Sequence, residues 1–367
     1  MIFEKSSSLS IKSIEELKEY MELSPEEEKK LKKIIDLHPM RITKYYLSLI
    51  DKNDENDPIK RMIIPSLEEL DTSGFYDTSG ECENTKTVGL QHKYEQTVLM
   101  LSTNKCFAYC RFCFRKRLVG LSNDEIVHRF ERAVNYIKKH KEINNVLVSG
   151  GDPFFLSAKA LEKFLQSLTR IPHIRFIRFG TRTPVVFPDR IINDSSFLGV
   201  LKKYSTKNKR IYVVTHFNHP REITNKSIEA INKLIGSNVI INNQTVLLKG
   251  VNDNPDTLAE LQNTLTSIGI TPYYVFQCRP VKRVKHHFQV LLYKAYQIVE
   301  EAKTKLNGCS KRFRFIMSHR SGKVEIVGIK DDNIYFKYHQ AKKPKDMGRF
   351  FMRKLNKTGT WLDDFKA

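Results

Sequence analysis

The 367-residue sequence predicts an α/β fold built on a parallel sheet, either open or curled into a barrel. Two observations carry this prediction. Six short apolar segments alternate with helix-length segments along the middle of the chain, and each apolar segment leads into polar or cysteine residues. Because ligands of such sheets bind at the carboxyl ends of the strands, we expect the functional site to lie in these loops.

The first 90 residues are predicted to form a helical N-terminal region. Residues 12–36 are expected to be helical, with Ser13 as one cap and Ser24 before Pro25 as a second helix start. A polar stretch at 51–58 and an irregular segment at 71–87 then lead into the main domain.

The main domain is predicted over residues 91–310, and a C-terminal segment follows over 311–367. The helix after the first strand is expected over 123–140. Further helices are centred on Leu161, Leu198, Ile228, Leu261 and Tyr296. The six predicted strands are Thr97–Ser102, Asn145–Val148, Arg175–Arg178, Ile211–Val214, Val239–Ile241 and Tyr273–Phe276.

The formal net charge of +21 raises the expectation of a polyanionic partner. Most of the lysines, however, are scattered over predicted helix surfaces, so we do not expect nucleic acid as a partner. The exception is a basic tail over residues 337–357 that is interleaved with Phe350 and Phe351. Its role stays open at this stage.

Membrane association and secretion depend on two kinds of segment, a membrane-spanning segment and a secretory signal. No segment reaches the roughly 20 apolar residues needed to span a bilayer, and the N-terminus lacks a basic segment followed by an apolar one. Six cysteines are too few for a disulfide framework in a chain of this length, and a tight cluster suits a reducing compartment. We therefore expect a cytoplasmic protein without a membrane partner.

Three cysteines, Cys106, Cys110 and Cys113, follow the first predicted strand at a C-x3-C-x2-C spacing. Three thiolates at this spacing can hold three corners of a [4Fe–4S] cluster and leave one iron open to a ligand. The alternative is half of a zinc site, which needs a second pair of ligands. No second pair is visible, because the remaining cysteines stand alone, so the spacing favours the cluster. Those remaining cysteines are Cys82, Cys278 and Cys309.

The loop after the second strand, Ser149-Gly150-Gly151-Asp152, has two readings. Glycine and Asp-Pro punctuate many loops, but next to a cluster a glycine pair lets the backbone approach a ligand closely. The acidic side chain then suits the amino group of S-adenosylmethionine.

Two further motifs also leave alternatives. His216 and His219 are either a metal-binding pair or hydrogen-bonding groups at the end of the fourth strand. Lys323 follows a glycine between two apolar runs. It is either an exposed lysine or the Schiff-base lysine of an aldehyde cofactor.

Taken together, these motifs resemble the radical S-adenosylmethionine (radical SAM) aminomutases of the lysine 2,3-aminomutase type. The resemblance extends over most of the chain, and several of its strings are specific to the family. They lie at residues 38–43, 46–50, 89–94, 148–153, 180–186, 215–220, 248–253 and 272–278, together with the cysteine loop.

The resemblance implies a partial (β/α)6 radical-SAM barrel whose [4Fe–4S] cluster is held by the three clustered cysteines. An external electron donor would drive cleavage of S-adenosylmethionine into methionine and a 5′-deoxyadenosyl radical, while pyridoxal 5′-phosphate would carry the migrating amino group. By position, Lys323 resembles the pyridoxal lysine, and Arg115 the clamp on the substrate α-carboxylate. The residues that would contact the cofactors are Lys93, Tyr94, Ser149, Gly150, Gly151, Asp152, His216, Gln244 and Lys323.

The substrate side departs from the lysine-specific members. They carry an aspartate after the Gln-Cys pair, where this chain has Arg279, and no acid is found at 315–322 before Lys323. A cation does not select a cationic side chain, so we expect a small-molecule amino-acid substrate other than lysine, with an acidic or neutral side chain contacting Arg279.

Two rival functions remain at this point. One is a radical SAM enzyme without aminomutase activity that acts on another metabolite or on a macromolecule through the basic tail. The other is a zinc-stapled binding module. The resemblance also suggests a homo-oligomer.

Overall fold

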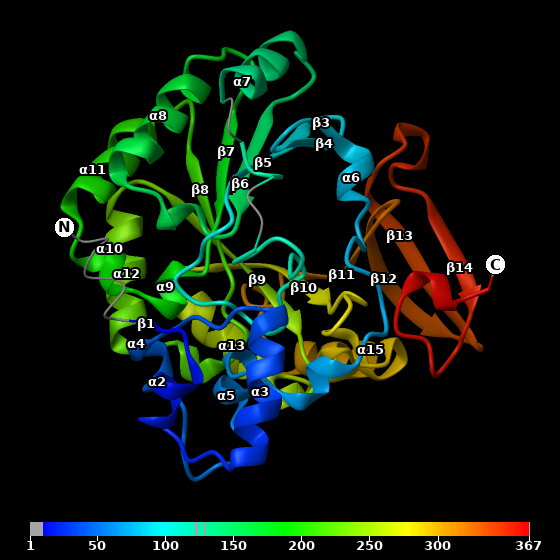
Figure 1. Ribbon diagram of the computed structural model, residues 1–367. Helices are drawn as coiled ribbons and strands as arrows, with labels where there is room; N and C mark the ends of the chain where they lie inside the picture. The colour runs from blue at the N-terminus through cyan, green and yellow to red at the C-terminus, as the bar shows by residue number, and fades with distance from the viewer. Residues whose placement is uncertain (1–9, 122–123, 128–129, 367) are drawn as a thin grey trace.

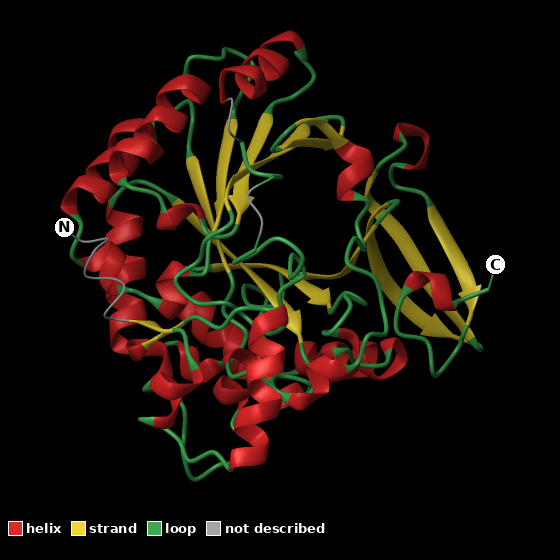
Figure 2. Ribbon diagram, in the orientation of Figure 1, coloured by secondary structure: helices red, strands yellow, loops and turns green. Residues whose placement is uncertain are grey.

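The computed structural model describes residues 10–121, 124–127 and 130–366. Within them, twelve strands form one curved sheet and follow one another in sequence order from β3 to β14. Helices lie along the outer side of the curve, as Figures 1 and 2 show. The predicted α/β class is confirmed.

The centre of the sheet is parallel. The six predicted strands correspond to β5–β10, and β11, which the sequence analysis did not separate from the C-terminal segment, adds a seventh parallel strand. The bounds are β5 (Thr97–Thr103), β6 (Asn145–Gly150), β7 (Phe176–Gly180), β8 (Ile211–Thr215), β9 (Ile240–Leu247), β10 (Thr271–Gln277) and β11 (Arg314–His319).

Antiparallel strands extend the sheet at both ends. They are β3 (Thr85–Thr87) and β4 (Leu90–Tyr94) beside β5, and β12 (Gly322–Lys330), β13 (Asn333–Ala341) and β14 (Phe350–Lys354) beyond β11. Among the described residues β3 and β14 are the two edges, so strand pairing does not close the barrel. Side chains connect the two ends instead: Lys93 Nζ lies 2.6 Å from the carbonyl oxygen of His319.

The crossover helices pack one apolar face on the sheet. In α8, for example, the buried side chains Leu161, Leu165 and Leu168 recur at helical spacing. The helices are α7 (Phe130–Lys139), α8 (Ala158–Thr169), α9 (Thr183–Val186), α10 (Asp189–Ile192), α11 (Ser195–Tyr204), α12 (Asn225–Gly236), α13 (Pro255–Ser267), α14 (Lys285–Phe288) and α15 (Leu292–Thr304).

The helix predicted over 123–140 is observed as α7, which is shorter at its N-terminal side. Residues 122–123 and 128–129 lie outside the described residues, and 124–127 adopt turn and coil conformations.

The N-terminal region is a set of short elements, most of which lie below the sheet in Figure 1, while residues 81–84 lie beside β4. The helical stretch expected over 12–36 consists of two helices. Both predicted starts are confirmed, because Ser13 and Ser24 each form a capping box. The elements are β1 (Ser10–Ile11), α2 (Ile14–Lys18), α3 (Pro25–Leu37), β2 (Ile42–Thr43), α4 (Lys44–Leu47), α5 (Pro58–Ile63), η1 (Leu67–Leu70) and α6 (Glu81–Asn84).

In the part of the chain that the structure describes, no helix is both long enough and apolar enough to cross a membrane.

Candidate active site

A cavity of about 300 Å³ lies inside the curve of the sheet, where the parallel strands end. Every residue that the sequence analysis proposed for the site lines it. These residues are Lys93, Tyr94, Cys106, Cys110, Cys113, Arg115, Ser149, Gly150, Gly151, Asp152, His216, Gln244, Arg279 and Lys323. The topology therefore brings together side chains that are more than 200 positions apart in the sequence.

The three clustered cysteines lie in an irregular loop between β5 and α7, and all three thiols are free. Burial raises the pKa of Cys113 to about 11 and that of Cys106 well above its usual value, and the neighbouring thiols act in the same direction. The raised pKa values of Cys106 and Cys113 oppose ionisation, and the positive charge of an iron–sulfur core would favour their thiolates. The donor set fits a [4Fe–4S] cluster.

The cysteine loop is tied to the N-terminal region by a fully buried ion-pair network. The Glu69 carboxylate accepts hydrogen bonds from Arg111 at 2.6 and 2.7 Å and from Lys116 at 2.5 Å. Burial alone would raise the pKa of Glu69, but the two cations lower it to about 2. The backbone amides of Tyr109 and Arg111 also donate to the carbonyl oxygens of Arg41 and Met62, which further anchors the loop to the N-terminal region.

Arg182, in the loop after β7, donates from Nη1 to the Cys110 sulfur at 2.9 Å. Its Nη2 donates to the Tyr46 hydroxyl at 2.8 Å and pairs with the buried Glu222. The guanidinium therefore contacts a proposed cluster ligand while a carboxylate behind it balances its charge.

The glycine pair brings the β6 loop against the cysteine loop. A Cβ at Gly150, where φ is +112°, would lie 2.4 Å from the Thr103 carbonyl oxygen, and one at Gly151 would lie 2.5 Å from that of Lys105. Only glycine permits this approach.

Asp152 is engaged with the protein itself. Its carboxylate accepts hydrogen bonds from the Thr181 hydroxyl at 2.6 Å and from the amides of Phe154 at 2.9 Å and Arg182 at 2.8 Å. These bonds join the loops after β6 and β7. Contact between Asp152 and the amino group of S-adenosylmethionine stays a prediction.

The two histidines of the β8 loop have different surroundings. His216 lines the cavity, and burial, followed by the charges of Arg182 and Arg115, lowers its pKa to about 4, so the imidazole is neutral. His219 caps a short 3-10 turn by accepting a hydrogen bond from the Arg221 amide. This geometry supports hydrogen bonding rather than a shared metal ion.

Arg115 and Arg279 share one aromatic neighbour at the far side of the cavity. The guanidinium carbons lie 4.4 Å and 4.1 Å from the ring centroid of Phe114. Arg115 is paired with the carboxylate of Glu81 at 3.1 Å. Arg279 instead donates to two hydroxyls, Ser79 and Ser318, each at 2.9 Å.

Lys323 is the second residue of β12 rather than lying on an open turn, and its side chain lines the cavity. A Cβ at the preceding Gly322 would lie 2.2 Å from the Gln340 carbonyl oxygen, so only glycine fits there. The amine lies 4.4 Å from the Tyr274 ring centroid. Burial, followed by the positive charges of Arg178, Arg279 and Lys93, lowers the pKa of Lys323 well below its usual value, which favours the neutral, nucleophilic form of the amine.

Lys93 and Tyr94 line the same part of the cavity from β4. Lys93 donates to the carbonyl oxygens of His319 and Ser79, and no carboxylate is among its bonded partners. Burial, then the charge of Arg279, lowers the pKa of Lys93 to about 7.

The cavity lining is strongly basic. Both of its carboxylates, Glu81 and Asp152, are bonded to the protein itself. The basic lining residues are Lys93, Arg115, Arg178, Arg182, Arg279 and Lys323. The cavity is therefore built to receive anions.

Sequence reasoning missed three residues of this site: Phe114, Glu81 and Arg178. Arg178 reaches into the cavity from β7, between the buried Ile177 and Phe179. A lone arginine inside an apolar strand was a usable signal for it. Glu81 lies in the segment expected to be irregular, and nothing local predicts its pairing with Arg115.

Residues 100–261 match the family model described as the radical SAM superfamily. This match and the three-cysteine loop in a partial β/α barrel define the class of the protein: it is a radical SAM enzyme. A [4Fe–4S] cluster and S-adenosylmethionine follow from that class.

The chain belongs to the lysine 2,3-aminomutase family. It is 41% identical over 356 residues to a putative L-lysine 2,3-aminomutase of Aquifex aeolicus, which covers 97% of this chain and 95% of that protein. It is 39% identical to the L-lysine 2,3-aminomutase of Clostridium subterminale over 86% of this chain and 76% of that one. It is also 38% identical to a glutamate 2,3-aminomutase of Clostridioides difficile over 75% of this chain and 64% of that one.

Proposed function

We propose that the protein is an amino-acid 2,3-aminomutase that moves an α-amino group to the β-carbon of an amino acid other than lysine. It uses a [4Fe–4S] cluster on Cys106, Cys110 and Cys113, S-adenosylmethionine and pyridoxal phosphate. The observation that carries this proposal is the far side of the cavity, where Arg279 stands in place of an acid and has only hydroxyl partners.

The cluster side supports radical generation. When bound, the cluster supplies the electron that cleaves S-adenosylmethionine. The protein holds the thiols together and, through Ser149, Gly150, Gly151, Asp152, His216 and Gln244, offers polar contacts around the cluster. The neutral His216 imidazole can accept or donate one hydrogen bond without adding charge.

The opposite wall supports pyridoxal phosphate. When bound, this cofactor supplies an aldehyde that takes up the migrating amino group. The amine of Lys323, whose lowered pKa favours its nucleophilic form, is suited to react with that aldehyde. Lys93 and Arg178 are close enough to lower the pKa of Lys323, and neither has a carboxylate among its bonded partners, so both can receive a phosphate dianion.

The two arginines around Phe114 support a substrate with anionic groups. Arg115 is proposed to bind the α-carboxylate, because a guanidinium fork can grip a carboxylate with two parallel bonds. Arg279 then meets the side chain, where an acidic or neutral group satisfies its free donors. A relative named for glutamate fits this preference.

The test is incubation of the cluster-loaded, reduced enzyme with S-adenosylmethionine, pyridoxal phosphate and a panel of amino acids, followed by analysis for β-amino acids. We expect a β-amino product from an acidic or neutral amino acid and none from lysine. Formation of β-lysine would overturn the substrate assignment.

The cofactor assignment has a separate readout. Borohydride reduction should fix pyridoxal phosphate to Lys323, which peptide mapping identifies, and Lys323→Ala should remove the label. Lys330→Ala, on the same strand but 78% exposed at its side chain, is the matched control and should keep it. Label retained in Lys323→Ala would contradict the assignment.

A second candidate is a radical SAM enzyme that acts on another metabolite or a macromolecule. It is favoured by the edge strand β14, which exposes Phe350 and Met352 beside basic residues. This function predicts 5′-deoxyadenosine formation without a β-amino product from any amino acid of the panel. If the partner is nucleic acid, its binding should depend steeply on salt.

A further inference from the structure

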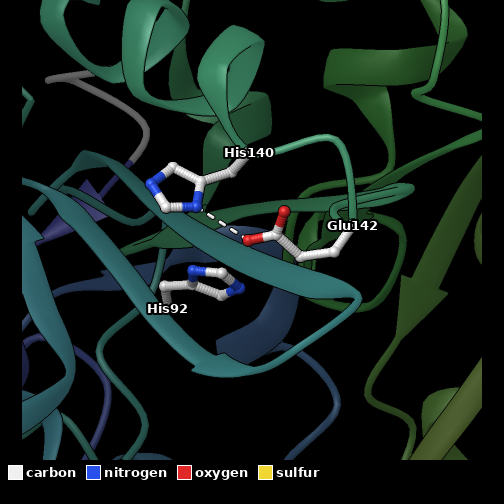
Figure 3. A group of neighbouring side chains, drawn as sticks. All are labelled: His92, His140 and Glu142. Carbon is white, nitrogen blue, oxygen red and sulfur yellow. Dashed lines mark hydrogen bonds and ion pairs between the residues drawn. The ribbon is translucent and has the colours of Figure 1, made fainter.

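Two histidines and a glutamate meet outside the cavity, where β4 faces the end of α7. His92 lies on β4, His140 follows the last residue of α7, and Glu142 lies in the turn before β6 (Figure 3). Their potential ligand atoms all lie within 4.8 Å of one another, and His140 Nδ1 is 2.7 Å from a Glu142 oxygen. None of the three lines the cavity.

The hydrogen bonds of His92 define its neutral tautomer. Nε2 lies 3.0 Å from the carbonyl oxygen of Glu95, which only accepts, so Nε2 carries the proton. Nδ1 is then the lone-pair nitrogen, and the Tyr136 hydroxyl donates to it at 3.0 Å. Histidine metal ligands typically donate their second ring N–H to a carbonyl or carboxylate in this way. His92 therefore has the tautomer of a ligand that binds a metal ion through Nδ1, and the ion would take the place of the Tyr136 hydroxyl there.

The end of α7 adds a favourable field for a cation. The backbone amide of His140 donates to the carbonyls of Tyr136 and Ile137, so its ring starts at the C-terminus of the helix. The helix dipole places partial negative charge there. The His140 ring also stacks on Tyr136 with centroids 4.0 Å apart, which limits its orientations.

We propose that His92, His140 and Glu142 bind a divalent transition-metal ion of the zinc class, with water as the remaining ligand. Two imidazoles and one carboxylate are a donor set that such ions prefer, and three protein ligands leave one tetrahedral position open. Zinc–ligand distances of about 2.0–2.2 Å require the donors to lie roughly 3.4 Å from one another, so the His140–Glu142 pair must open from its 2.7 Å. Glu142 is exposed and can make most of that adjustment.

The ion would fasten β4 to the first crossover helix. Lys93 and Tyr94, which follow His92 directly, line the cavity. Binding at this site therefore stabilises one wall of the cavity without contact with the cluster thiols. The proposal does not depend on the function proposed above.

The test is a zinc titration against a chromophoric chelator, carried out on the full-length, cluster-loaded enzyme. Cys82 and Cys309 are exposed thiols that would also bind zinc, so Cys82→Ser and Cys309→Ser are introduced into every protein compared. The variants are His140→Ala and the near-isosteric Glu142→Gln. His286→Ala, which removes an exposed imidazole elsewhere, is the matched control.

We expect one zinc ion per chain beyond the cluster, weakened by about 10-fold or more in His140→Ala and Glu142→Gln and unchanged in His286→Ala. X-ray absorption at the zinc edge should show nitrogen and oxygen ligands and no sulfur. Zinc affinity that is equal in all four proteins, a sulfur ligand, or no bound zinc would overturn the proposal. Glu142→Gln keeps the test valid if His140→Ala does not fold.

Discussion

The two sides of the cavity handle buried charge in opposite ways. On the cluster side each buried cation has a buried carboxylate beside it: Glu69 pairs with Arg111 and Lys116, and Glu222 pairs with Arg182. On the far side Arg115 is paired with Glu81. Among the described residues, however, the hydrogen-bond partners of Arg279 are two hydroxyls and those of Lys93 are carbonyls.

On the cluster side the buried charges are neutralised within the protein. On the far side we expect a bound ligand to neutralise them. The neutralised ion pairs of the cluster side fix the cysteine loop in place. This arrangement suits a cluster that is common to the whole superfamily. Burial lowers the pKa values of Lys93 and Arg279, with a smaller contribution in the same direction from Arg279 for Lys93 and from Arg115 for Arg279. A ligand that supplies anionic groups would favour the charged forms of both side chains. Specificity within the family should therefore depend on the far side.

The largest effect is expected from breaking the neutralised side. Glu69→Gln leaves Arg111 and Lys116 buried without a carboxylate, and removing one partner of a buried ion pair typically costs 3–5 kcal/mol. We expect a loss of about that size in the free energy of unfolding, measured by chemical denaturation.

Glu26→Gln is the matched control for this experiment, because it breaks the exposed pair with Lys30. Exposed pairs contribute about 0–1 kcal/mol. An equal loss in both variants would show that the cluster side is not stabilised by its buried charges.

The next effect concerns the uncompensated side. Arg279→Gln removes a charged donor, so we expect L-glutamate binding to weaken by about 10–100-fold, which corresponds to roughly 1.5–3 kcal/mol. L-Glutamine, the neutral near-isostere, should change much less. Equilibrium dialysis with the pyridoxal-phosphate-loaded enzyme measures both affinities, and equal weakening for the two amino acids would refute a role of Arg279 in reading side-chain charge.

The two sides also differ in how far the sequence predicts them. The cysteine loop can be predicted from the sequence because its three cysteines lie within eight residues of one another. The six strands can be predicted because apolar segments alternate with helix-length segments. The partners of the charged side chains cannot be predicted from the sequence. Glu69 meets Arg111 across 42 positions, and Arg279 meets Ser79 across 200, so only the tertiary fold brings them together.

Local rules predict a close approach without naming its partner. Gly150 and Gly151 lie against Thr103 and Lys105, which lead into the cysteine loop, while their approach to a ligand stays a prediction. The strand β11 was missed because no helix separates it from the C-terminal hairpins that follow.

A smaller effect is expected in the pH dependence of stability, through the amine of Lys93. An unfolded lysine keeps its proton to near pH 10.5, whereas Lys93 in the folded protein loses its proton near pH 7. Between pH 7 and 8 the unfolded state therefore binds more protons, and raising the pH favours the folded state. Lys93 should add about 1 kcal/mol of stability over that pH unit.

The slope of unfolding free energy against pH measures this contribution in ligand-free protein. Lys93→Met should lower the slope by about that amount, while Lys330→Met, at an exposed position of β12, should leave it unchanged. An unaltered slope in Lys93→Met would mean that Lys93 is not forced to lose its proton by burial.

The smallest effect on stability, and the finest test of the comparison, comes from Phe114. Its ring is shared by the paired Arg115 and the unpaired Arg279, and each cation–π contact contributes roughly 0.5–2 kcal/mol. Phe114→Leu should cost about 1 kcal/mol of stability, while Phe114→Tyr, which keeps the ring, should cost less.

If the ring positions Arg279, Phe114→Leu should also reduce the preference for L-glutamate over L-glutamine, although residue 114 carries no charge. If that preference persists in Phe114→Leu but is lost in Arg279→Gln, the two serine hydroxyls alone position the guanidinium, and the far side is set by hydrogen bonds rather than by the aromatic contact.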